Sequence, residues 1–326
     1  MASLFRSALL CGCALLLAAG AAWAQGYPSR PVNLMVPYPP GGPSDAVARI
    51  FAPALAKALG QSVVVENLGG ASGTVAAQKV LSTPADGYNV FQGSPNELIL
   101  APMVTGAKLK AEDFRLVQAV GDGVMVFVAR KDLPANSVDE LVALARKSAD
   151  RPLNYGSVGV GSLYHLILEK AQQEAGIQMT HVPYKGNTPL LQDLAGGQVD
   201  FAVLVYSAAM AAMAEQGRLK IIGQIGAERS ELLKDVPTAS EGKELKNLVF
   251  RIWSGLLVSR NTPEDVVQKL HQAIGASLQD PGMREQLAAQ TQMPAAPATL
   301  AESTRFYEAE IARYREIARS IRLQPQ

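Results

Sequence analysis

The feature that most constrains the fold is a repeated alternation of short apolar runs with segments of helical periodicity. Several of the runs are apolar almost throughout, as expected for strands buried on both faces of a parallel sheet. Strands that alternate with helices predict an α/β protein of doubly wound architecture. The expected strands are 32–38, 62–66, 88–92, 116–120, 125–129, 153–156, 179–183, 200–205, 220–224 and 255–259.

The intervening segments place their apolar residues on one helical face. In 45–59 these residues recur at three- and four-residue spacing, and Gly60 follows as a stop. The segment 163–175 has the same pattern before Gly176. From 263 to 321 the pattern is almost wholly helical, interrupted only near the prolines at 281 and 294.

The N-terminus predicts export to the periplasm. Arg6 precedes an apolar run over 8–22, and Ala22-Trp23-Ala24 fits the rule for a cleavable signal peptide, so residues 1–24 are expected to be removed. The apolar run is too short for a membrane span, although an uncleaved anchor is the alternative.

Cysteine usage and charge exclude several function classes. Both cysteines, Cys11 and Cys13, lie in the apolar run, so the mature chain is expected to have no disulfide, thiol nucleophile or thiolate metal site. The chain has 30 Lys and Arg against 29 Asp and Glu, and Arg6 lies in the signal peptide, which leaves the mature chain neutral. Nucleic-acid binding is therefore not expected, and an anion would have to be held by local dipoles.

The length predicts two domains, and no long linker separates them. A chain without a linker is expected to cross more than once between two lobes, here near Gly123-Val124 and near Arg251-Trp253. The predicted division is 25–124 together with 252–326 as lobe 1, and 125–251 as lobe 2, with a cleft and hinge between them.

Two glycine-rich segments each follow a predicted strand and precede a predicted helix. The first loop, 36–45, reads VPYPPGGPSD, with Ser44 or Asp45 as the expected helix cap. The second loop, 154–162, reads NYGSVGVGS, with Ser162 as the expected cap. Helix starts offer unsatisfied N–H groups and partial positive charge, so two such loops predict a shared anion site. Either loop is equally well explained as a tight strand-to-helix turn.

Sharper motifs are missing from both loops. Neither has the spacing of a P-loop or of a dinucleotide-binding fingerprint. Ser157 lacks the G-x-S-x-G spacing of a nucleophile elbow.

The loops and five further motifs together resemble the extracytoplasmic solute receptors of the tripartite tricarboxylate transporter family, also called Bug proteins. The resemblance extends through nearly the whole mature chain. The matching segments are 27–31 (YPSRP), 37–45 (PYPPGGPSD), 84–88 (PADGY), 154–157 (NYGS), 159–162 (GVGS) with His165, 181–186 (HVPYKG), 196–200 (GGQVD) and 235–238 (DVPT).

The resemblance implies a two-lobed Venus-flytrap fold of the periplasmic-binding-protein type, with mixed, mostly parallel sheets flanked by helices. It implies a cleft that holds a ligand carboxylate through backbone groups and ordered water, and permease subunits as membrane partners. No cofactor, metal or catalytic residue is expected, and the protein is expected to be a monomer. The residues expected to bind the ligand are Tyr38, Pro40, Gly41, Gly42, Pro43, Ser44, Asp45, Ser94, Asn96, Ser157, Val158, Gly159, Gly161, Ser162, His165, Tyr184, Lys185, Gly186, Leu204, Val205 and Tyr206.

Two departures from the family pattern bear on the ligand. Where relatives often carry an Asp-Asn pair, this chain has Leu204-Val205, followed by Tyr206. A carboxylate there would suit a ligand amino group, so its replacement favours a non-amino acid or an aromatic acid. Leu68-Gly69 also replaces the usual Arg-Pro near the cleft.

Some candidate residues also have structural explanations. His165 is expected to pack or cap, and His181 to support Tyr184. Trp253 is expected to pack at the hinge, with a place in the cleft wall as the alternative. Asp45 is expected to fix the first loop, because an ionised acid facing the cleft would repel an anion. Lys185 is either a cation for a second ligand carboxylate or a solvated surface residue.

The leading hypothesis is therefore a receptor that captures a small carboxylate for a tripartite transporter. A receptor that reports occupancy to a sensor kinase would have the same binding site. A periplasmic hydrolase or isomerase on the same fold is the third alternative, but it would need a nucleophile–base pair, a metal cluster or paired carboxylates at interpretable spacing.

Overall fold

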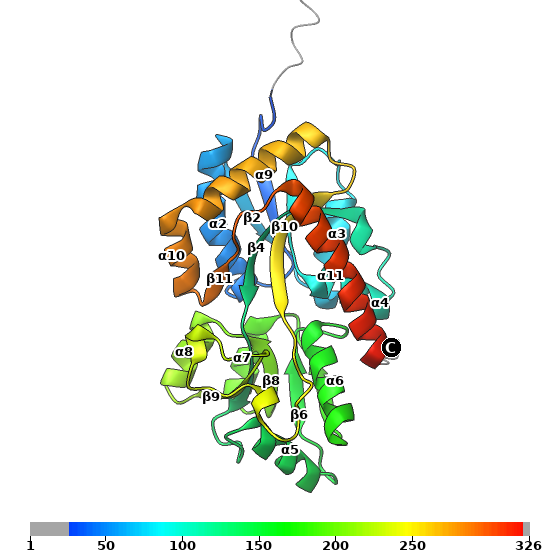
Figure 1. The fold of residues 1–326 in the computed structure, drawn as a ribbon, viewed down its shortest axis with the longest axis vertical. Helices are drawn as coiled ribbons and strands as arrows, with labels where there is room; N and C mark the ends of the chain where they lie inside the picture. Colours follow the sequence, from blue (N-terminus) through cyan, green and yellow to red (C-terminus); the bar gives the residue numbers. More distant parts are fainter. Residues whose placement is uncertain (1–25, 322–326) are drawn as a thin grey trace, which may run out of the picture.

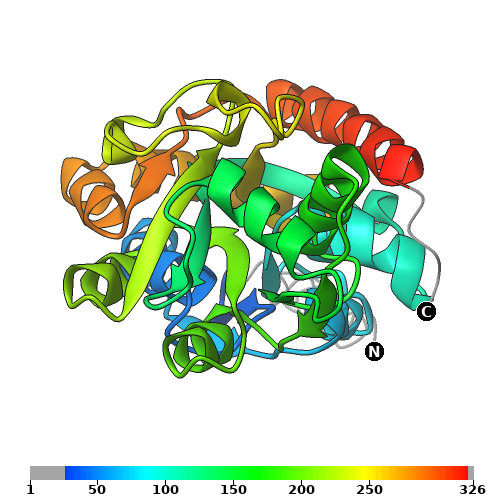
Figure 2. The same cartoon turned by 90° about the horizontal axis from the view of Figure 1, so that it is seen from below.

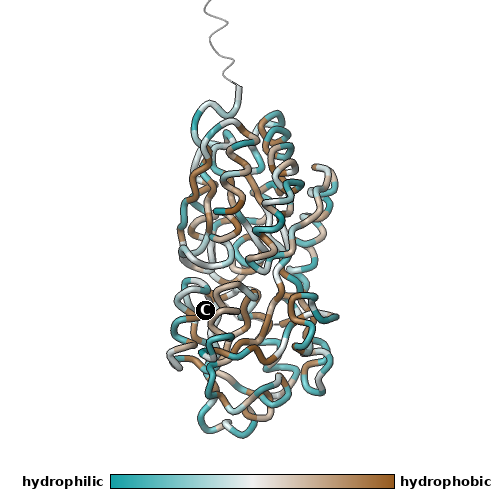
Figure 3. The backbone as a smooth tube through the Cα atoms, turned by 90° about the vertical axis from the view of Figure 1, so that its left-hand side faces the viewer, coloured by the Kyte–Doolittle hydropathy of each residue, from teal (hydrophilic) through white to brown (hydrophobic). Residues whose placement is uncertain are grey.

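The computed structural model describes residues 26–321, so the predicted signal peptide, 1–24, lies outside the described residues. Two sheets lie in separate halves of an elongated molecule (Figures 1 and 3). The six-stranded sheet has the order β11 (Gln292–Pro294), β4 (Phe114–Gly123), β10 (Ile252–Ser259), β3 (Asn89–Gly93), β1 (Val32–Val36) and β2 (Val63–Asn67). The five-stranded sheet has the order β7 (Thr180–Pro183), β6 (Asn154–Ser157), β8 (Phe201–Val205), β5 (Met125–Arg130) and β9 (Leu219–Ile225).

Both sheets are mixed, but they are less parallel than the sequence predicts. In the described part of the chain, β1 pairs in parallel with β2 and β3, and β6 pairs in parallel with β7 and β8. The other five pairings are antiparallel. The antiparallel pairs involve the strands next to the two crossings between the sheets: β10 pairs with β3 and β4, β4 also pairs with β11, and β5 pairs with β8 and β9.

All ten expected strands are present, and the three-residue strand β11 was missed because its segment is short and follows a helical pattern. Gly60 and Gly176 end α2 and α6 in the left-handed conformation, as predicted. The helices are α2 (Pro43–Leu59), α3 (Thr74–Leu81), α4 (Ala101–Thr105), α5 (Val138–Lys147), α6 (Leu163–Ala175), α7 (Asn187–Ala195), α8 (Ala208–Glu215), α9 (Glu264–Gln279), α10 (Pro281–Ala289) and α11 (Leu300–Ile321). Short helical turns include η2 (Ala71–Gly73) and the π-helical turn η3 (Asn96–Leu100).

Helices cover both faces of the six-stranded sheet. On one face, α2, α9 and α10 pack together over β1, and Leu34, Phe51 and Leu270 are fully buried in this layer. On the other face, α3 and α11 pack on β3, β4 and β10 (Figure 1). Viewed from below, α11 runs beside the helices of the other half and contacts α6 (Figure 2).

The chain passes from the six-stranded to the five-stranded sheet between Gly123 and Met125, and returns between Ile225 and Ile252. One buried apolar cluster continues across these connections, from Phe91 in the first sheet to Phe127 in the second. The two halves are therefore packed against each other rather than held apart. Among residues 26–321, no helix has the length and apolar character that a membrane crossing requires.

Candidate functional site

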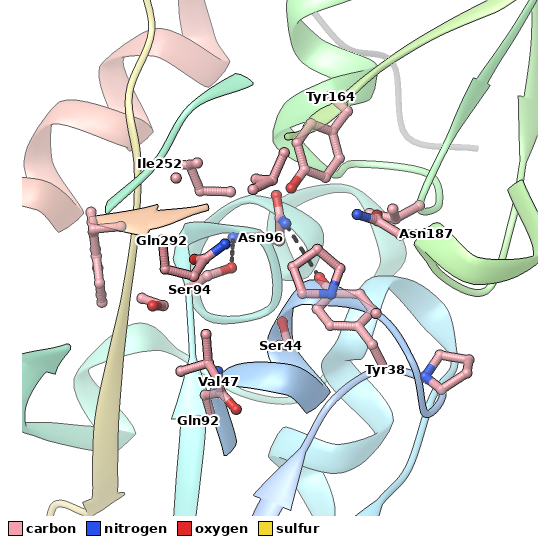
Figure 4. Close-up of a pocket in the computed structure, with 18 residues that line it drawn as sticks. Tyr38, Ser44, Val47, Gln92, Ser94, Asn96, Tyr164, Asn187, Ile252 and Gln292 are labelled. Carbon is pink, nitrogen blue, oxygen red and sulfur yellow. Dashed lines mark hydrogen bonds between the residues drawn. The ribbon is translucent and has the colours of Figure 1, made fainter. Parts of the chain in front are cut away.

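A cavity lies between the two halves and takes its walls from both of them (Figure 4). It encloses about 630 Å³, including the solvent at its mouth. None of the residues that line it is an Asp, Glu, Lys, Arg or His. The lining residues are Tyr38, Pro39, Gly42, Pro43, Ser44, Val47, Gln92, Ser94, Asn96, Gly123, Val158, Tyr164, Asn187, Val205, Ile252, Trp253, Ser254 and Gln292.

The first loop brings the start of α2 to the cavity wall. The N-cap is Gly42, Pro43 is the first helical residue, and no side chain caps the helix. The prediction that Ser44 or Asp45 caps the helix is therefore wrong, because proline, which needs no N–H partner, starts the helix earlier. Asp45 instead accepts hydrogen bonds from Gly41 N and Arg49 Nε, both at 2.9 Å, and so fixes the loop.

A second bare helix start, that of α7, faces the first. Its N-cap is Gly186, and no side-chain hydrogen bond caps it. Asn187 lines the cavity, and the Thr188 hydroxyl donates to Pro40 O at 3.3 Å across the two halves. The first-turn N–H groups of a helix have no partner within the helix. Two sets of such donors therefore converge on one uncharged cavity, an arrangement that favours an anion.

The second loop is used differently from the first. Ser162 caps α6, as predicted, by accepting from His165 N at 3.4 Å. Gly161 N donates to His165 Nδ1 at 3.2 Å, and Leu163 N donates to Asn96 Oδ1 at 2.8 Å. The N–H groups of Gly161, Leu163 and His165, which the sequence offers to an anion, are therefore bonded to protein side chains.

The glycines of the second loop serve close packing instead. A Cβ on Gly159 would clash with Ser72, and one on Gly161 would clash with Val104, both in the other half of the molecule. The Ser72 hydroxyl donates to Val160 O at 2.7 Å in the same contact. The second loop is thus a docking element between the halves, and of its residues only Val158 lines the cavity.

A buried hydrogen-bond network lies behind the first-loop wall. Tyr38 donates to Glu97 Oε2 at 3.0 Å, and Asn96 Nδ2 donates to the Tyr38 hydroxyl at 3.2 Å. Ser94 donates to the same carboxyl through its hydroxyl, at 3.0 Å, and through its backbone N–H. Glu97 is fully buried, and this burial raises its pKa to about 7. Glu97 is not among the residues predicted from the sequence, although a charged residue beside Asn96 in an apolar stretch was a usable signal.

The stacked imidazoles of His165 and His181 pack beside the second loop. The rings of His165 and His181 lie 3.9 Å apart, and His181 Nε2 lies 2.7 Å from the Ser157 hydroxyl. Burial lowers the pKa of His165, and burial together with the neighbouring His165 lowers the pKa of His181 to about 3. His165 packs as predicted, but His181 supports Ser157 rather than Tyr184, because its ring bonds to the last residue of β6.

The remaining candidates lie away from the cavity lining. Tyr184 donates to Asp193 at 2.8 Å, and Lys185 is exposed. Leu204 is buried in the sheet, and Tyr206 O accepts from Thr291 at 2.9 Å. The predicted residues that do not line the cavity are Pro40, Gly41, Asp45, Ser157, Gly159, Gly161, Ser162, His165, Tyr184, Lys185, Gly186, Leu204 and Tyr206. Those that do are Tyr38, Gly42, Pro43, Ser44, Ser94, Asn96, Val158 and Val205.

Several lining residues were missed by sequence reasoning. Gln92 stands out afterwards as a polar residue in an apolar strand, and Asn187 as the residue after a glycine at a helix start. Gln292 belongs to the unpredicted strand β11. Trp253 was not missed: it lines the cavity, the alternative role that the sequence left open, and its ring packs edge-on against Phe306, with centroids 5.4 Å apart.

This architecture, two α/β halves with an uncharged cavity between them, defines the class of two-lobed periplasmic binding proteins. A family model described as the tripartite tricarboxylate transporter family receptor matches residues 47–323. The chain belongs to that family.

Relatives and solved structures agree with this assignment. BugT of Bordetella pertussis is 31% identical over 303 residues, which cover 91% of this chain and 90% of BugT. The structure of Rpa4515 of R. palustris with adipate has a TM-score of 0.86 at 31% identity, covering 92% of this chain and all of that one. MatC of Rhodopseudomonas palustris with bound malate has a TM-score of 0.82 at 28% identity, covering 90% of this chain and all of that one.

Proposed function

We propose that this protein is a periplasmic receptor that captures a small carboxylate and delivers it to the permease subunits of a tripartite transporter. The observation that carries the proposal is the pair of bare helix starts, α2 and α7, that face each other across an uncharged cavity. A carboxylate held there accepts hydrogen bonds from backbone N–H groups of both halves and so favours the closure of the two halves around it.

The walls of the cavity support a ligand with an apolar body and no amino group. Val47, Val158, Val205 and Ile252 line it, and the lining offers no carboxylate to an ammonium group. Adipate and malate in the structures of the two relatives are small carboxylates without an amino group. We infer a non-amino acid, with an aromatic acid as a member of the same class.

The compartment and the division into lobes are part of the proposal. Family membership supports a periplasmic location, with cleavage after Ala24 as the expected processing step. The crossings at 123–125 and 225–252 support lobes made of 25–124 with 252–326 and of 125–251. Permease subunits rather than a sensor kinase are the favoured partners because the family model is that of a transporter receptor.

An enzymatic function is not favoured. Ser157 and His181, at 2.7 Å, come nearest to a nucleophile–base pair. Ser157 is fully buried, and its hydroxyl also bonds to the backbone of Gly159. A substrate carbonyl therefore has no access to it.

The test is calorimetric titration of purified 25–326 with a panel of aliphatic and aromatic carboxylates and their uncharged amides. We expect saturable binding of at least one carboxylate and a raised melting temperature. Asn187→Asp, which adds a negative charge at the start of α7, should abolish binding while the fold stays intact. The matched control is Asn261→Asp, an exposed site after β10. Amides binding as well as acids, or Asn187→Asp binding normally, would refute the proposed anion site.

A further inference from the structure

At one end of the cavity lies Gln92, whose buried side-chain oxygen accepts no hydrogen bond from any residue that the structure describes. Gln92 lies on β3 beside Leu256 of β10 and is only 3% exposed. Within residues 26–321, its Oε1 has no hydrogen-bond partner. Figure 4 shows Gln92 next to Val47 of α2, away from Asn187 and Tyr164. Burying an unpaired amide is costly, and an apolar residue would suit this position better if packing alone decided it.

The other polar residues that line the cavity with Gln92 are uncharged. Ser254 reaches Gly121 O only at 3.4 Å, and Gln292 Nε2 reaches Gln290 O only at 3.4 Å. Both line the cavity with Gln92. Behind the wall, the ionisable groups of the buried network are the Glu97 carboxyl and the Tyr38 phenol, and neither carries a positive charge in any protonation state.

An uncharged polar lining discriminates between chemical groups at the far end of a ligand. A second carboxylate would lose its hydration without meeting a cation. A methyl group would leave the Gln92 amide unpaired. A carboxamide side chain both donates and accepts, so its best partner is a neutral group that does the same.

We propose that the Gln92 end of the cavity is a specificity subsite for a neutral hydrogen-bonding group, so that the ligand is a monocarboxylate with a hydroxyl or carboxamide at its far end. This inference rests on the proposed function, which places the single carboxylate at the starts of α2 and α7. Gln92 is then the residue that separates this class of ligand from dicarboxylates and from unsubstituted acids.

The experiment compares acids that differ only at the far end. The aliphatic set is hexanoate, 6-hydroxyhexanoate and adipate, and the aromatic set is 4-methylbenzoate, 4-hydroxybenzoate and terephthalate. In calorimetric titrations of the full mature chain, the hydroxylated member of at least one set should bind about tenfold tighter than the methyl member, since one neutral hydrogen bond is worth about that factor. It should also bind tighter than the dicarboxylate.

The variant Gln92→Leu should remove the advantage of the hydroxyl group while leaving the binding of the methyl acid equal or stronger. Gln92→Met is the second variant, in case a branched side chain disturbs the strand. Gln198→Leu, at an exposed position, is the matched control and should keep the preference of the wild-type protein.

The outcomes separate this inference from the proposed function. Equal binding of the methyl and hydroxyl acids, tightest binding of a dicarboxylate, or an unchanged preference in both Gln92 variants would overturn the subsite. Failure of both sets while other carboxylates bind would overturn it too. Failure of every carboxylate would instead overturn the proposed function itself.

Discussion

The first and second loops are alike in sequence and opposite in use. Both follow a strand, both contain glycines, and both precede a helix. The first loop leaves the start of α2 uncapped at the cavity, whereas Gly161 of the second loop and the first turn of α6 donate N–H groups to His165, Asn96 and Ser162. A glycine-rich helix start is therefore an anion site only if nearby side chains leave its N–H groups available.

The groups behind the two loops also differ in their response to pH. Behind the first loop, a buried carboxyl has a raised pKa, and burial favours its protonated form. Behind the second loop, buried imidazoles have lowered pKa values, and burial favours their neutral form. In both regions burial disfavours the charged form. A lower pH therefore favours the buried, protonated carboxyl behind the first loop and disfavours the buried, neutral imidazoles behind the second.

The largest expected effect comes from placing the same charge in each loop. Ser44→Asp adds a carboxylate beside the proposed anion site, and two like charges about 4 Å apart repel by about 4 kcal/mol near a protein surface. We expect carboxylate binding to weaken by a factor of about a hundred or more. Val160→Asp, at a half-buried position of the second loop, should change the affinity for the carboxylate by less than about threefold. Equal losses in a titration would show that both loops hold the anion.

The next effect concerns Glu97. In the unfolded chain its carboxyl ionises with a pKa near 4.5, and in the folded chain the pKa is about 7. Unfolding therefore releases a proton between these values, so the stability from this group is present below pH 4.5 and is lost as the pH rises to about 7. The difference corresponds to about 3 kcal/mol.

The measurement is urea denaturation of the wild type and Glu97→Gln from pH 4 to 8. The difference in stability between the two proteins should change by about 3 kcal/mol across this range, with the wild type losing relative stability as the pH rises. A pH-independent difference would mean that the carboxyl has the same pKa in the folded and unfolded chains.

The buried imidazole pair should make stability depend on pH in the opposite direction. The pKa of His181 falls from 6.5 in the unfolded chain to about 3 in the fold, so unfolding takes up a proton between these values. Stability is fully present above pH 6.5 and is lost as the pH falls toward 3. Because His181 is partly exposed, we expect a loss of only about 2 kcal/mol. His181→Gln should flatten the acid limb of a urea-denaturation profile, and an unchanged limb would assign it to other groups.

The sequence predicted the parts of this comparison that depend on local chemistry. The Ser162 cap, the left-handed stops at Gly60 and Gly176, and the ten strands follow from spacing within a short segment. By contrast, the hydrogen bond that occupies the Leu163 N–H after the second loop comes from Asn96, which is 67 residues away in the chain. Long-range contacts of this kind are invisible to local patterns, and so is the meeting of α2 and α7.

The smallest expected effect comes from removing the hydrogen bond between Asn96 and the Leu163 N–H, which follows the second loop. Asn96 joins the halves by accepting from Leu163 N at 2.8 Å, and it also donates to Tyr38. Asn96→Ala leaves a buried N–H without its partner in the closed arrangement, which costs about 1–2 kcal/mol. We expect ligand affinity to fall by about tenfold, mainly through faster release, and the ligand-free protein to scatter X-rays with a larger radius of gyration. Asn89→Ala, which removes a bond within one sheet, is the control. If Asn96→Ala kept the wild-type release rate and radius, the second loop would not act as a contact that holds the halves together, and its saturated N–H groups would serve only to shape α6.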